Sequence, residues 1–81
     1  MYYWRAAVKH EDEKSYTIVY FATEHIDYVA DVVDFLESYG LQSCNCYLRH
    51  LNKLEFISNI LFAPIATMNT FQHYSRAVLI G

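Results

Sequence analysis

Alternating apolar and polar positions open the chain and predict a β-hairpin. Residues 2–10 alternate, and four apolar side chains fall on one face. These side chains are Tyr2, Trp4, Ala6 and Val8. Residues 15–22 are almost all β-branched or aromatic, which is typical of a strand. The polar run from His10 to Lys14 separates the two segments, so we expect two strands joined by a five-residue loop.

A helical period follows and predicts an amphipathic helix over roughly residues 24–39. Thr23 is its expected N-cap, because a threonine hydroxyl can accept a hydrogen bond from a backbone N–H of the first turn. Gly40 is its expected C-terminal stop. The apolar stripe consists of Ile26, Val29, Ala30, Val33 and Leu36, widened by Val32 and Phe35. We expect this stripe to be the buried side of the helix.

Weaker patterns complete the chain. Residues 41–50 alternate as a third strand would, and a second helical stripe then ends before Pro64. This stripe consists of Leu51, Leu54, Ile57, Ile60 and Leu61. Residues 65–74 fit a helical turn as well as a strand, and residues 75–80 are typical of a final apolar strand.

These elements predict a single α+β domain spanning residues 1–81, in the order ββαβα(β)β. The sheet is expected to be mixed or antiparallel, built from the hairpin and one to three further strands. Because the connections are short, we expect both helices to pack on one face of that sheet.

Composition adds an apolar surplus to this picture. Hydrophobic residues make up 54% of the 81 positions, and aromatic residues, including eight tyrosines, make up 17%. A domain of this size cannot bury so much apolar surface, and exposed apolar patches mark contact sites. The surplus therefore favours a homodimer or a partner protein, although tyrosine also tolerates half-exposure.

Charge and targeting features narrow the function classes. The net charge of −3 disfavours a protein that binds nucleic acid directly by neutralising phosphates. The first ten residues lack the apolar stretch of a signal peptide, and the apolar run of residues 56–66 is too short to span a bilayer. Two cysteines one residue apart form no disulfide framework. We expect a cytoplasmic protein that does not insert into membranes.

The cysteines raise the question of a metal site. Cys44, Cys46 and His50 form a C-x-C-x3-H pattern, and thiolates and imidazole are zinc ligands. Structural zinc needs a fourth ligand, and the spacing is not that of a known finger. We favour the interpretation that both cysteines are small apolar strand residues, and expect no cofactor; a small metal or thiol site remains the alternative hypothesis.

Catalytic motifs point away from an enzyme. Only Gly40 and Gly81 are glycines, so a glycine-rich phosphate loop cannot form. Three histidines could act as bases, but sequence alone pairs none of them with a nucleophile. These are His25, His50 and His73. We expect a non-enzymatic protein, with an oligomeric enzyme whose site lies at a subunit interface as a further alternative.

The strongest functional feature is a row of carboxylates on the first predicted helix. No lysine or arginine occurs between Lys14 and Arg49, yet five acidic residues do. We name them the acidic face: Glu24, Asp27, Asp31, Asp34 and Glu37. Their spacing of three or four residues aligns them opposite the apolar stripe, and Tyr28 and Tyr39 are expected contact anchors beside them. The row predicts docking onto a basic partner surface, or it only keeps the protein soluble.

In its first half the chain resembles small phage-encoded inhibitors of the anti-CRISPR type. The resemblance rests on residues 2–39, a hairpin (YYWRAAVKH and SYTIVYFA) followed directly by an amphipathic helix (TEHIDYVADVVDFLESYG). It is a resemblance of size, architecture and acidic surface. It implies a viral protein that acts in the host-cell cytoplasm by binding a nucleoprotein effector through its basic surface.

Overall fold

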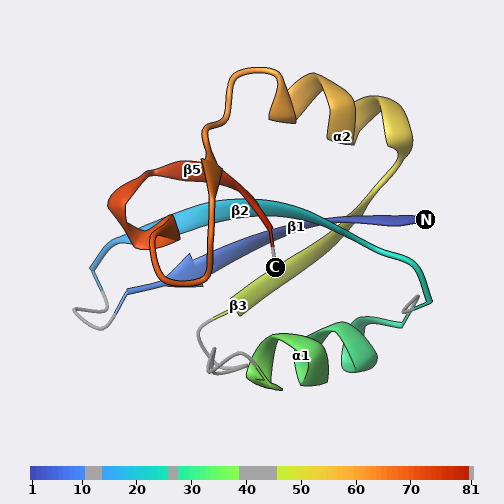
Figure 1. Ribbon diagram of the computed structural model, residues 1–81. Helices are drawn as coiled ribbons and strands as arrows, with labels where there is room; N and C mark the ends of the chain where they lie inside the picture. The colour runs from blue at the N-terminus through green and yellow to red at the C-terminus, as the bar shows by residue number, and fades with distance from the viewer. Residues whose placement is uncertain (11–13, 26–27, 39–45, 81) are drawn as a thin grey trace.

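The fold is an α+β sandwich built on one five-stranded mixed sheet (Figure 1). The computed structural model describes residues 1–10, 14–25, 28–38 and 46–80. The strands lie in the order β3-β1-β2-β5-β4. Along the chain the elements follow the order ββαβαββ, with a short 3-10 helix between the last two strands. The predicted α+β class is confirmed, and the predicted order of elements roughly matches the observed order.

The hairpin forms the centre of the sheet. Strand β1, Tyr2–Lys9, pairs antiparallel with β2, Tyr16–Thr23, in a register that places Trp4 opposite Phe21. Strand β3, Cys46–Leu51, pairs antiparallel with the other side of β1. The predicted alternation of β1 is confirmed, since Trp4, Ala6 and Val8 are all buried.

The C-terminal strands extend the sheet on the side of β2. Strand β5, Arg76–Leu79, runs parallel to β2, and β4, Ile65–Ala66, runs parallel to β5 at the edge. The ambiguous stretch 65–74 therefore contains this two-residue strand followed by the 3-10 helix η2, Phe71–His73. Phe71 is fully buried under the sheet and anchors the connection.

The two helices lie on opposite faces of the sheet, which corrects the prediction that both pack on one face. Helix α1, Val29–Ser38, covers one face, and α2, Lys53–Ile60, covers the other (Figure 1). The reason lies in the central strands, which carry large apolar side chains on both faces. Val19 of β2 belongs to the cluster under α1, whereas the adjacent Tyr20 belongs to the cluster under α2. If the helices covered only one face of the sheet, the apolar side chains of the other face would remain in water.

Helix α1 begins later than predicted. Thr23 is the last residue of β2 and pairs with Tyr2, so it is not an N-cap. Its buried hydroxyl instead accepts a hydrogen bond from the indole Nε1 of Trp4 at 3.1 Å. The buried side of α1 is centred on Val32 and Leu36, whereas Val29 and Ala30 of the predicted stripe are exposed.

Helix α2 buries a different side from the one predicted. Phe56 is buried against Tyr3, with ring centroids 4.7 Å apart, and Ile60 packs on the same cluster. Of the predicted stripe, Leu51 is buried at the end of β3. Ile60, also of that stripe, packs inward, whereas Leu54, Ile57 and Leu61 are exposed. The sequence offers apolar residues on both sides of α2, and the sheet selects the side that carries the aromatic ring.

Candidate functional site

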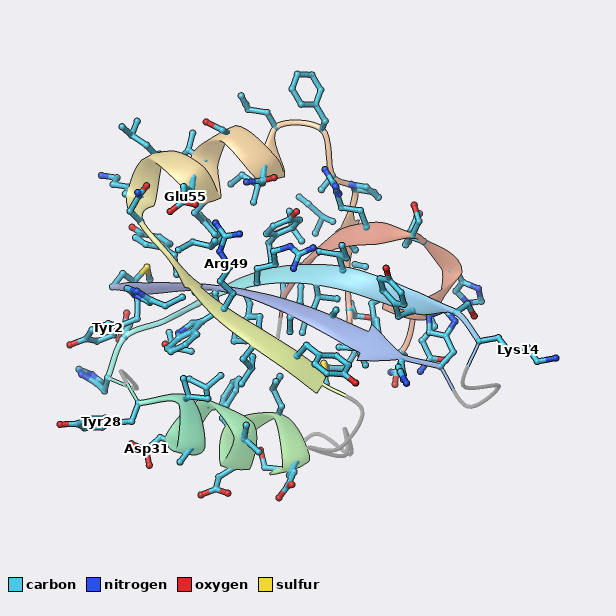
Figure 2. The ribbon with its side chains drawn as sticks, turned by 180° about the vertical axis from the view of Figure 1, so that it is seen from behind. Tyr2, Lys14, Tyr28, Asp31, Arg49 and Glu55 are labelled. Carbon is cyan, nitrogen blue, oxygen red and sulfur yellow. The ribbon has the colours of Figure 1, made fainter. Side chains whose placement is uncertain are left out.

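Helix α1 presents three carboxylates to solvent along its outer side. Asp31, Asp34 and Glu37 are exposed and follow one another at intervals of three residues. Tyr28, just before the helix, is 70% exposed. Figure 2 shows Tyr28 and Asp31 projecting away from the sheet. The core residues Val32 and Leu36 hold the opposite side of the helix against the sheet, so these acidic side chains cannot turn inward.

No cation offsets this charge within the described part of the chain. Helix α1 contains no lysine or arginine, and its last turn carries no basic residue. The ion pairs found among the described residues join His25 to Glu24 and Arg49 to Glu55. Asp31, Asp34 and Glu37 belong to neither. Neighbouring like charges at this spacing oppose helix formation by about 0.2–0.5 kcal/mol per pair. The packing of the buried side of α1 on the sheet must offset this repulsion.

The remaining residues predicted for the acidic face divide into two groups. Asp27 and Tyr39 lie outside the described residues. Glu24 is exposed but follows directly on β2, before the helix begins, and its carboxylate lies 3.8 Å from His25 Nε2. Glu24 therefore does not belong to the helical row predicted from the sequence, because the pairing of Thr23 with Tyr2 extends the strand into the predicted first turn. The members of the row that the structure describes on α1 are Asp31, Asp34 and Glu37.

The predicted metal or thiol candidates are only partly described. Cys44 lies outside the described residues, and Cys46 is placed by its backbone, which pairs with Val8. His50 is exposed, and its ring meets Trp4 edge-on at 5.1 Å between centroids. Within the described ranges no group of three or more metal-ligating side chains comes together. The ring contact gives His50 a packing role next to the core tryptophan.

The structure pairs a histidine with hydroxyl groups that the sequence did not single out. At the loop end of the hairpin, His10 Nε2 lies 2.7 Å from Thr17 Oγ1, and His10 Nδ1 lies 3.1 Å from Ser15 Oγ. Buried Thr17 donates its own proton to the carbonyl of Tyr74 at 2.7 Å. Thr17 must therefore accept a proton from Nε2, which leaves Nδ1 of the neutral ring to accept from Ser15.

This cluster joins the hairpin to the C-terminal segment. It has the order of a nucleophile, a base and an orienting group, with Thr17 in the place that a carboxylate takes in a catalytic triad. Because the threonine is neutral, it orients the ring but cannot stabilise an imidazolium. In the sequence, the only sign of this contact was that His10 and Ser15 lie on either side of the predicted hairpin loop, which brings the residues at its two ends together.

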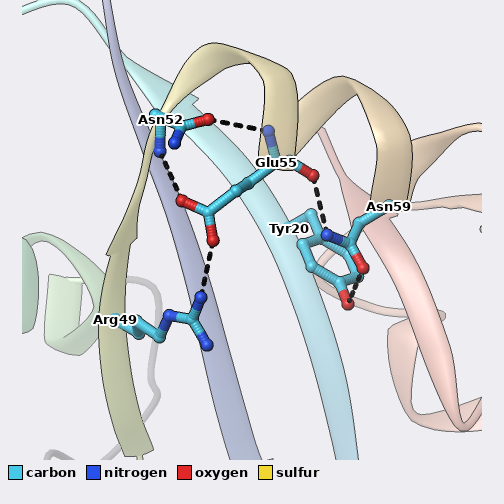
Figure 3. A network of polar contacts seen from close by, with 5 residues as sticks. All are labelled: Tyr20, Arg49, Asn52, Glu55 and Asn59. Carbon is cyan, nitrogen blue, oxygen red and sulfur yellow. Dashed lines mark hydrogen bonds and ion pairs between the residues drawn. The ribbon is translucent and has the colours of Figure 1, made fainter.

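A second polar network fixes the orientation of α2 (Figure 3). Asn52 caps the helix: its side chain accepts from the backbone N–H of Glu55 at 2.8 Å, while the Glu55 carboxylate accepts from the backbone N–H of Asn52 at 3.2 Å. The same carboxylate also accepts a hydrogen bond from the guanidinium Nη2 of Arg49 in β3 at 2.6 Å. One turn later, Asn59 donates to the backbone carbonyl of Glu55 and accepts from the hydroxyl of buried Tyr20 at 3.3 Å.

Comparisons with protein families, with curated proteins and with solved structures found no match for this chain. No helix within the described ranges is long and apolar enough to cross a membrane.

Proposed function

We propose that this protein is a non-enzymatic inhibitor or adaptor that docks the outer side of α1 onto a basic surface of a partner protein. The observation that carries the proposal is the row of Asp31, Asp34 and Glu37, exposed on a helix without a single cation. A partner surface built to hold nucleic acid offers the complementary charge. A nucleoprotein effector is accordingly the proposed class of partner, in line with the resemblance to anti-CRISPR inhibitors.

The placement of the charge supports a docking role. α1 is held by its buried side only, and its outer side is the most distant layer of the molecule from α2 (Figure 1). A convex helix in this position can enter a groove without any change in the sheet. Tyr28 beside it offers an aromatic ring and a hydroxyl at low entropic cost, which is typical of residues that dominate binding energy.

Electrostatics sets the expected behaviour of the complex. Complementary charge accelerates encounter and selects the partner more than it increases affinity. Because exposed charges are screened over about 10 Å at 0.1 M salt, raising the salt concentration should slow association while leaving apolar contacts in place.

The test is affinity capture from a lysate of the host cell, with the bound protein identified and its binding then measured directly. The variant Asp31→Lys/Asp34→Lys/Glu37→Lys reverses the row and should lose the partner. A matched control, Glu11→Lys/Asp12→Lys/Glu13→Lys, changes the net charge by the same amount through the acidic residues of the hairpin loop. It should retain the partner.

Each outcome decides the proposal. A partner lost on reversal of α1 and kept on reversal of the loop supports docking through the helix. Equal losses in both variants would reduce the effect to overall charge. Retention by both variants, with circular dichroism unchanged, would show that the carboxylates of α1 serve solubility alone.

A further inference from the structure

The outer side of α2 and the turn that follows it form an apolar surface with nothing packed on it among the described residues. Leu54 is 78% exposed, Leu61 70%, Phe62 87% and Ile65 69%. Ile57 lies between them on the helix and is 41% exposed. We name these five residues the α2 patch. They all come from one segment of twelve residues, 54–65.

The network under α2 makes this exposure unavoidable. At 100° per residue, Leu54, Ile57 and Leu61 lie within about 60° of one another on one side of the helix. Phe56 lies at least about 100° away from all three, and Ile60 lies at the edge between the two sides, about 60° from Ile57; both pack on the sheet. Rotating α2 to bury the patch would break the Asn59–Tyr20 hydrogen bond and the Arg49–Glu55 ion pair and would expose the ring of Phe56.

The patch is large for a protein of this size. From the exposed fractions it offers about 400–600 Å² of apolar surface, roughly a tenth of the 5368 Å² of the chain. This is the upper end of what a soluble monomer exposes in one place. Two such patches in contact would bury about 800–1,200 Å², and the polar rim brings the total to the lower end of a specific interface.

We propose that the occupant of the α2 patch is a second copy of this chain, related by a two-fold axis. A two-fold contact sets a surface against itself, so it favours a surface that carries no concentration of like charge. The patch meets this condition, since the only charged residue in segment 54–65 is Glu55. Its carboxylate is turned to Arg49 and to the helix cap. A different partner selected by charge would find no charge here to recognise.

The pairing is antiparallel and centred between Ile57 and Ser58. Leu54 of each copy then meets Leu61 of the other, and Lys53 approaches the C-terminal end of the second α2. That end carries no basic residue in its last turn, and a cation there stabilises the negative end of the helix dipole. The acidic outer sides of the two α1 helices lie on the far faces of the two sheets, where they do not repel one another.

Sedimentation equilibrium over about 1–200 μM, the range in which an interface of this area assembles, tests the pairing. The wild-type chain should approach twice its mass of 9.5 kDa. Leu61→Glu should raise the dissociation constant about tenfold or more, and Phe62→Ser, which lies beyond the helix, should weaken association without touching α2. Val29→Glu places the same charge on an exposed apolar position of α1 and should remain dimeric.

Charge exchange tests the antiparallel register. Leu54→Lys alone should weaken the dimer, while Leu54→Lys/Leu61→Glu should restore it, because each lysine then faces a glutamate of the other copy. A wild-type chain that stays monomeric throughout the range overturns the proposal, as does a dimer indifferent to Leu61→Glu and Phe62→Ser. A double variant no stronger than Leu54→Lys overturns the antiparallel register.

Discussion

Replacing Thr23 by valine tests the buried hydrogen bond that joins Thr23 of β2 to Trp4 of β1. The indole N–H of Trp4 donates to Thr23 Oγ1 at 3.1 Å, and the two residues are 1% and 7% exposed. Valine preserves the branched shape and the strand preference of threonine but removes the acceptor. The indole N–H is then buried without that partner, which destabilises a protein by about 1–3 kcal/mol.

We expect Thr23→Val to lower the free energy of unfolding by about 1–2 kcal/mol, because the added methyl group recovers part of the loss through burial. In a domain of this size, that corresponds to a fall of about 4–16 °C in the melting temperature. Urea unfolding followed by circular dichroism measures it. Because the chain has one tryptophan, its fluorescence reports separately whether the indole stays buried.

A double-mutant cycle isolates the hydrogen bond from other effects of the substitution. Trp4→Phe removes the N–H group and leaves a cavity. In the Trp4→Phe background, Thr23→Val breaks no hydrogen bond to the indole, because the donor is already absent. The coupling free energy between the two positions should be about 1–2 kcal/mol. A coupling within about 0.3 kcal/mol of zero would refute the reasoning and show that this hydrogen bond does not stabilise the fold.

Two further predictions concern α2. Phe56→Ala should lower the free energy of unfolding by about 3–4 kcal/mol, because it removes the ring that packs on Tyr3 and leaves a cavity. Leu54→Ala should change it by less than about 0.5 kcal/mol, measured by chemical denaturation of the dilute, monomeric chain. Equal effects of the two substitutions would contradict the orientation of the helix. Arg49→Ala should lower it by less than about 1 kcal/mol, since that side chain is 62% exposed. Glu55→Ala should lower it by about 1–2 kcal/mol, because it also removes the carboxylate that accepts from the Asn52 backbone N–H in the capping box. A larger loss from Arg49→Ala would show that the ion pair rather than the capping box fixes α2.

Strand periodicity was the most informative part of the sequence. The alternation of β1 predicted which side chains would share a face, because successive side chains of a strand point to opposite faces of the sheet. The same pattern placed Trp4, Ala6 and Val8 in one cluster, as the structure has them. The hairpin and the exposed carboxylates Asp31, Asp34 and Glu37 could likewise be predicted from local pattern.

Helix orientation was less accessible to the sequence. Around α2, apolar residues occur on both sides, so periodicity alone could not choose between Leu54 and Phe56. The choice depends on partners distant in sequence: Tyr3 for the ring of Phe56 and Tyr20 for the amide of Asn59. The start of α1 was decided in the same way, because pairing with Tyr2 keeps Thr23 in the strand.

The sequence by itself determined the α+β class, the hairpin and the chemistry of the outer side of α1, since all three follow from local composition and spacing. Only the tertiary structure decided that the helices cover opposite faces, that Ser15, His10 and Thr17 meet, and that five apolar residues of segment 54–65 remain in water. These features depend on which residues become neighbours when a two-sided apolar sheet folds. A local pattern carries no record of that neighbourhood, because burial is shared between segments far apart in the chain.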